Sequence, residues 1–144
     1  MLVIKENTKA MKKLLFLLLT IIFFGCKSNI SPENVDPLGS WGGVGVQLEV
    51  TENNSFFDMD CSSAELNNKL KTTGNQVVEQ FGTYTYEHGG PILIDKKPDV
   101  HPAKFRGEIV NDSMKIFITI LDQKRADIQL KMKKNALGRV IKCL

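Results

Sequence analysis

Beyond residue 38 the chain is a succession of short runs in which apolar and polar residues alternate, separated by turn-forming residues. The clearest run spans residues 114–122, where Met114, Ile116, Ile118 and Ile120 fall on alternate positions. Alternate side chains of a β-strand point to the same face, so this pattern predicts a strand with one buried face. The region shows no convincing helical period. We therefore expect an all-β chain.

Seven or eight strands are predicted between residues 39 and 144. The remaining strands are expected at residues 43–50, 56–61, 76–88, 103–110, 127–134 and 138–144, while residues 64–70 fit a strand or one helical turn. Within 43–50 the predicted inward set is Val44, Val46, Leu48 and Val50. Within 127–134 the predicted inward set is Ile128, Leu130 and Met132. Gly82, inside 76–88, marks the expected place of a bulge or bend.

Short turns between these strands favour antiparallel pairing of sequence neighbours. An antiparallel up-and-down β-barrel removes the exposed edges that an open meander would leave free to aggregate. A barrel of seven or eight strands is therefore the expected fold, with a β-sandwich as the alternative.

The N-terminal stretch KKLLFLLLTIIFFGCKSN, residues 12–29, places two lysines before an unbroken apolar run. That run, residues 14–24, is much shorter than the roughly 20 residues that a membrane-spanning helix needs. It fits the apolar region of a signal peptide, with Lys12 and Lys13 as its basic start and Met11 as an alternative initiator.

The end of the run, Phe23-Phe24-Gly25-Cys26, resembles the lipobox of bacterial lipoproteins. The resemblance implies that residues 1–25 are a lipoprotein signal peptide and that Cys26 becomes an acylated N-terminus, anchored in a membrane by its acyl chains. Lys27 follows the cysteine, whereas the retention signal for the inner membrane resembles aspartate at that position. We therefore expect the protein in the bacterial cell envelope, at the outer membrane, facing the periplasm or the cell surface. A plain secreted protein is the alternative.

Removal of residues 1–25 changes the charge. The whole chain carries a formal charge of +3, but the remaining residues hold 15 basic and 15 acidic side chains. General affinity for nucleic acid or for an anionic membrane surface needs a concentrated basic excess, so the composition disfavours it. Residues 26–38 are polar, contain two prolines and are expected to be a flexible tether to a single β-barrel domain at 39–144.

With Cys26 acylated, Cys61 and Cys143 remain as an even pair in an exported protein. Export favours oxidation, so the pair predicts a disulfide. The last strand of a barrel returns beside the first, and this disulfide is expected to hold that seam.

The stretch LGSWGG, in which Gly39 precedes Trp41 by two residues, resembles the Gly-x-Trp opening of lipocalin-like (calycin) barrels. Arg139, in the last predicted strand, sits where such barrels often carry a basic residue over that tryptophan. The resemblance implies a lipocalin-like fold in which Trp41 and Arg139 form a structural cation–π pair.

The most distinctive run is TYTYEHGGP, residues 83–91. Tyr84 and Tyr86 share one strand face, and Tyr86, Glu87 and His88 are expected to form a polar rim at the barrel mouth. A structural interpretation needs only a glycine turn after the strand. Residues 89–102 are expected to be an irregular loop, and its Lys96 and Lys97 complete the candidate binding surface.

Motifs for catalysis are missing from the sequence. There is no G-x-S-x-G and no phosphate-binding glycine loop, and His88 and His101 lack the spacing of a strong metal motif. We therefore expect no enzyme, no metal and no cofactor. The expected function is a lipid-anchored module of the cell envelope that binds another envelope protein. A lipocalin-like carrier of a small apolar ligand and a purely structural lipoprotein are the alternatives.

Overall fold

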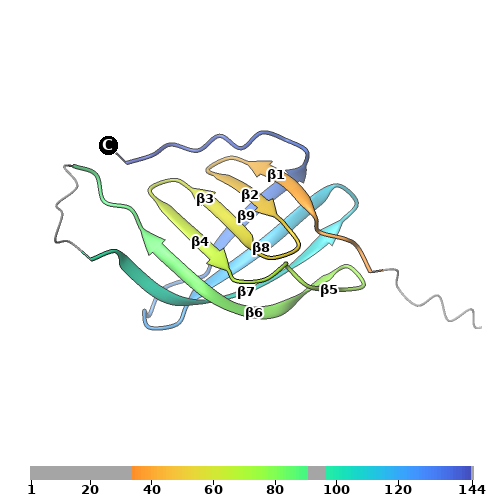
Figure 1. The fold of residues 1–144 in the computed structure, drawn as a ribbon, viewed down its shortest axis with the longest axis horizontal. Coiled ribbons are helices and arrows are strands. Elements are labelled where there is room, and N and C mark those ends of the chain that lie inside the picture. The colour runs from red at the N-terminus through yellow and green to blue at the C-terminus, as the bar shows by residue number, and fades with distance from the viewer. Residues whose placement is uncertain (1–33, 91–96, 144) are drawn as a thin grey trace, which may run out of the picture. The chain divides into compact units, whose positions relative to one another are not determined.

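The computed structural model of the chain describes residues 34–90 and 97–143. Every regular element in these ranges is a β-strand (Figure 1). In chain order the strands are β1 (Gly39–Gly43), β2 (Val46–Val50), β3 (Ser55–Met59), β4 (Ser62–Leu66), β5 (Thr72–Thr73), β6 (Gln76–Tyr86), β7 (Asp99–Val110), β8 (Ser113–Ile120) and β9 (Ile128–Lys134). The described residues contain no helix able to span a membrane. The predicted signal peptide, Cys26 and Lys96 lie outside the described ranges.

The strands form one closed antiparallel sheet. β1 to β4 pair in sequence order, as do β6 to β9, while β9 pairs with β1 and β4 pairs with β6. The ring has eight strands, and the two-residue β5 pairs only with the start of β6. The predicted up-and-down β-barrel is therefore confirmed, its architecture is consistent with a lipocalin-like fold, and the alternative β-sandwich is wrong.

Alternate side chains of each strand fill the inside of the barrel. The four residues predicted to share one face of β8 are all at most 3% exposed. Across the interior, the rings of Phe57 in β3 and Phe105 in β7 stack with centroids 5.4 Å apart. Leu70, in the segment between β4 and β5, is also buried and joins the same core. Hydrophobic burial is thus continuous through the barrel.

The first predicted strand, 43–50, is in fact the turn and second half of a hairpin. β1 and β2 meet at Val44 and Gly45, and Gly45 has a φ of 73°, a conformation that glycine adopts without strain. Val44 is 88% exposed, so its predicted inward position is wrong, whereas Val46, Leu48 and Val50 are buried. LGSWGG contributes a strand of its own because Trp41 is drawn into the core.

The last predicted strand, 138–144, is absent from its described part, residues 138–143. Residues 136–143 instead run along the outside of the barrel as an extended segment, which we call the C-terminal strap, with one parallel bridge between Val44 and Arg139. The backbone N–H of Gly138 donates to the side chain of Gln47 at 2.5 Å. A Cβ on Gly42 would overlap the carbonyl of Ala136, so glycine at this position lets the strap lie against β1.

The predicted disulfide between Cys61 and Cys143 is present, with the two Cα atoms 4.9 Å apart. It does not hold the seam between the last and first strands. It ties the end of the strap to the turn between β3 and β4, where Lys142 also forms ion pairs with Asp58 and Glu87. Burial alone would disfavour the charged form of Lys142, but these two carboxylates raise its pKa above the ordinary value.

Two further connections differ from the expectation. β7 begins at Asp99, so His101 and Pro102 belong to a strand and the predicted loop 89–102 is shorter. Pro102 is accommodated opposite Thr83, and its carbonyl accepts from Leu121 at 2.9 Å. The undecided segment 64–70 begins as strand β4 and then leaves the sheet after Leu66.

Reduction of the disulfide should lower the thermal stability of the barrel markedly. It closes a loop of 82 residues, for which the chain-entropy argument gives about 4 to 5 kcal/mol of stabilisation. The measurement is the melting temperature with and without reductant, with the Cys61→Ser/Cys143→Ser double variant as the control that reductant leaves unchanged. Alkylation of both thiols in native, unreduced protein would contradict the bond.

Candidate functional site

One end of the barrel carries a connected cluster of polar and aromatic side chains. It is built from the end of β6, the start of β7 and the loop between β8 and β9. In an up-and-down barrel these connections lie at the same end, so residues distant in sequence meet there. We call this group the histidine cluster; its members are Tyr86, His88, Asp99, His101, Asp122, Gln123 and Arg125.

His101 is held between two carboxylates. Its Nδ1 lies 2.8 Å from Asp122 Oδ2, and its Nε2 lies 3.0 Å from Asp99 Oδ1. The imidazole can donate from both nitrogens only when it is protonated. The hydrogen bond that His101 donates to Asp122, followed by the charge of Asp122 and by the contact with Asp99, therefore raises the pKa of His101.

Asp99 in turn joins the two histidines. Its second oxygen, Oδ2, lies 3.0 Å from His88 Nε2. These contacts, first with His88 and then with His101, lower the pKa of Asp99 below the ordinary value of an aspartate. The carboxylate thus stays ionised where it can order both imidazole rings.

Tyr86 forms the aromatic side of the cluster. Its ring packs edge-on against Tyr84 and against His101, with centroid separations of 4.9 and 5.3 Å. Its hydroxyl contacts Gln123 Oε1 at 3.0 Å and accepts a hydrogen bond from Arg125. These contacts tie the loop between β8 and β9 to the end of β6.

The histidine cluster is held together by contacts between its own side chains. Among the described residues, no group of three or more histidine, cysteine or carboxylate side chains could hold a metal ion. The carboxylates instead contact imidazole nitrogens directly. What the cluster offers is a fixed, partly charged surface that responds to pH.

The predicted site residues divide between this cluster and other places. Tyr86 and His88 belong to it, and Tyr84 lies buried beneath it. Lys97 is exposed where the chain is described again before β7. Glu87, expected at the rim with Tyr86 and His88, points instead to Lys142 of the strap.

Arg139 does not pack over Trp41. The cation there is Lys134, whose Nζ lies 5.4 Å from the centre of the indole, while the Trp41 Nε1–H donates to the Pro37 carbonyl at 2.7 Å. Arg139 is exposed on the strap and takes part in the fold through its backbone. The basic residue over the indole thus comes from β9, the strand that pairs with β1.

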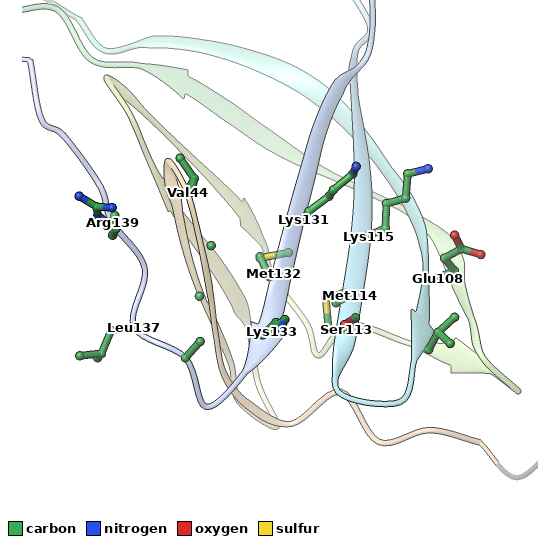
Figure 2. Close-up of a pocket in the computed structure, with 14 residues that line it drawn as sticks. Val44, Glu108, Ser113, Met114, Lys115, Lys131, Met132, Lys133, Leu137 and Arg139 are labelled. Carbon is green, nitrogen blue, oxygen red and sulfur yellow. The ribbon is translucent and has the colours of Figure 1, made fainter.

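Apart from the histidine cluster, a groove lies on the outer wall of the barrel. This groove has a volume of about 590 Å³ and lies between the strap, which carries Leu137 and Arg139, and the strands that carry Lys115, Lys131 and Glu108 (Figure 2). Its volume falls within the range of small-molecule and peptide sites. The sequence alone gives no sign of this groove, because its lining comes from the strap and from residues that only strand pairing brings together.

Asp122, Gln123 and Arg125 were also missed in the sequence. The predicted topology contained a clue, because an up-and-down barrel brings the connection after β8 to the same end as the connection after β6. The residue types alone gave no clue, since short polar loops are common at strand ends.

The stabilising effect of the Asp122–His101 contact should decrease as the pH rises. Because the pKa of His101 is raised, its contribution is complete below the ordinary histidine pKa of about 6.5 and is lost as the pH passes through the raised value. The difference in melting temperature between wild type and Asp122→Asn should therefore be larger at pH 6 than at pH 9. Asp112→Asn, in the exposed turn between β7 and β8, is the control; an equal difference at both pH values would contradict the coupling.

Comparisons with known proteins identify no family for this chain. No protein-family model matches the chain, and searches of curated proteins and of solved structures found no match. What the sites do therefore has to follow from their own residues.

Proposed function

We propose that this protein is a lipid-anchored module of the bacterial cell envelope that binds through its outer surface and carries out no catalysis. The anchor is Cys26, and the tether leads from it to the barrel. The binding surface includes the histidine cluster and the adjoining exposed chain at Lys97. The outer membrane is the proposed location, because lysine follows Cys26.

The observation that carries the proposal is the filled interior. Trp41, Phe57 and Phe105 are fully buried, and the stacked phenylalanine rings occupy the middle of the barrel. An eight-stranded barrel has an interior that its own side chains can just fill or that can hold one small ligand. This packing favours binding on the outside over the carriage of an apolar ligand inside.

The buried polar groups support the same view. Within the described residues, every buried side-chain nitrogen or oxygen has a hydrogen-bond partner. Gln80 accepts from the backbone of Lys71 at 2.7 Å, and Ser55 accepts from the backbone of Leu70 at 2.8 Å. A ligand chamber usually presents a few polar groups that await a partner. Here these groups fix the segment that closes one barrel end.

The anchor has its own test. The mature protein isolated from membranes should begin at Cys26 and carry acyl groups on that residue, as intact mass and peptide mass spectrometry would show. Cys26→Ser should abolish acylation and cleavage at this position, while Cys61→Ser leaves both intact. A soluble mature chain that begins elsewhere would contradict the proposal.

The binding surface is tested by changing exposed residues of one barrel end. His88→Ala combined with Lys96→Ala and Lys97→Ala should abolish or strongly reduce recovery of an envelope partner in cross-linking pull-downs from native membranes. The melting temperature should remain near that of the wild type, since His88 and Lys97 are exposed. Lys71→Ala with Asn67→Ala, both exposed in the segment between β4 and β5 at the opposite barrel end, is the matched control.

Two outcomes would contradict surface binding at this end. One is a wild type that recovers no partner and a triple variant that loses stability, which would leave a structural lid. The other is a tightly bound apolar molecule, found by native mass spectrometry of freshly isolated protein and released by Phe105→Ala, which would support the carrier.

A further inference from the structure

The outer groove is lined by two rows of side chains that cross neighbouring strands. One row joins Glu108, Lys115 and Lys131, which are direct partners across β7, β8 and β9. The next row joins Val110, Ser113 and Lys133 in the same way, and Lys133 is paired with Gly42 of β1. Ser113 and Gly42 have small side chains that leave space in the groove between the larger residues. The strap forms the side of the groove next to β1.

These rows concentrate positive charge. Lys115 and Lys131 stand directly opposite each other, and like charges in such a pair repel, although Glu108 is the partner of Lys115 on its other side. Lys133 and Arg139 add two further cations to the lining, and Glu108 is the single acid in it. Across residues 34–90 and 97–143, none of these four cations forms an ion pair. The groove is therefore electrostatically complementary to a polyanionic surface, although the mature chain as a whole is neutral.

Apolar side chains project from the same face. Leu137 is 91% exposed and Val44 is 88% exposed, and Val110 is half-exposed at the opposite wall. The aliphatic stems of the lysines extend this apolar lining while their ammonium groups reach outward. Exposed apolar residues surrounded by lysine and arginine are the combination that binds the interface of anionic membranes.

The groove also lies close to where the chain enters the barrel. Lys134, which directly follows the groove residue Lys133, donates from Nζ to the carbonyl of Asp36 at 3.4 Å. Asn34 lies eight positions after Cys26, a distance of at most about 26 to 29 Å even when fully extended. A membrane that holds Cys26 is therefore within reach of this wall.

We propose that the groove wall docks on the anionic lipid surface of the membrane in which the protein is anchored. Lys115, Lys131 and Lys133 contact lipid phosphates, and Val44 and Leu137 enter the boundary between headgroups and acyl chains. The charge and apolar arguments do not need the anchor, whereas the argument from reach rests on the proposed function. The histidine cluster contributes no residue to this lining, so docking of the groove leaves the cluster to act separately.

The test uses the acylated full mature protein reconstituted in two kinds of vesicle, phosphatidylcholine alone and phosphatidylcholine with phosphatidylglycerol. The anchor holds the protein on both, so only the docking differs. The readout is the rate of acetylation of each lysine by an amine-reactive ester, measured by peptide mass spectrometry. Lys115, Lys131 and Lys133 should react about three- to tenfold more slowly on the anionic vesicles, since each cation near such a surface contributes about a fivefold preference. Lys97 and Lys124, which are exposed and do not line the groove, are internal controls and should react equally on both.

A matched pair of variants ties the protection to this wall. Leu137→Asp places a negative charge on the groove and should remove the protection, while Leu121→Asp, half-exposed in the loop after β8, should keep it. Their melting temperatures report whether the barrel is intact. Equal reactivity on the two vesicle types, protection that survives Leu137→Asp, or protection that appears only when an acidic envelope protein is added would overturn the proposal. If Cys26 proves not to be acylated, the anchor fails separately, and the same labelling with unanchored chain added to the vesicles still decides whether the groove docks.

Discussion

The pairing of β4 with β6 is the contact on which the whole structure depends, because it turns a meander into a barrel. It joins four residue pairs, from Ser62 with Tyr86 to Glu65 with Thr83. Gly82 permits this approach, since a Cβ there would overlap the carbonyl of Glu65. Without the pairing, two strands would present unsatisfied N–H and C=O groups to solvent. Closure also places Tyr84 and Tyr86 at the barrel end where the histidine cluster forms.

The C-terminal strap is a second layer of organisation added to the closed sheet. It crosses β1 and β2 on the outside, where Gly42 leaves room, and it ends at the disulfide with Cys61. Its backbone exchanges hydrogen bonds with the β1–β2 hairpin, through Gly45 N–H to Arg139 and Arg139 N–H to Gly43. The strap therefore stabilises the hairpin and also creates the wall of the outer groove. The disulfide thus affects the shape of a surface as well as the stability of the fold.

Much of this fold was predictable, because period-two alternation and short turns specify antiparallel strands directly. The face of β8 followed from such a local pattern, whereas the pairing of the two cysteines followed from their even number in a chain expected to be exported. The first hairpin was missed because Trp41 and its flanking glycines carry no alternation, although they form β1. The C-terminal residues were predicted as a strand from their composition, but β1 already pairs with both β2 and β9, so they found no free edge. The register irregularity of β6 lies between Val77 and Gln80 and not at Gly82, whose role is close packing.

The candidate surfaces show where sequence reasoning loses information. The net charge did not predict the basic groove. The mature chain is neutral as a whole, but strand pairing and the strap bring four cations together on one wall. Lys115 and Lys131 are 16 positions apart in the chain and stand side by side only because β8 pairs with β9. The histidine cluster has the same origin, since His101 meets Asp122 across a loop and not within a motif. In a barrel of this kind the core is encoded by local periodicity, whereas the surfaces that can bind are encoded by register, and register is fixed only after closure.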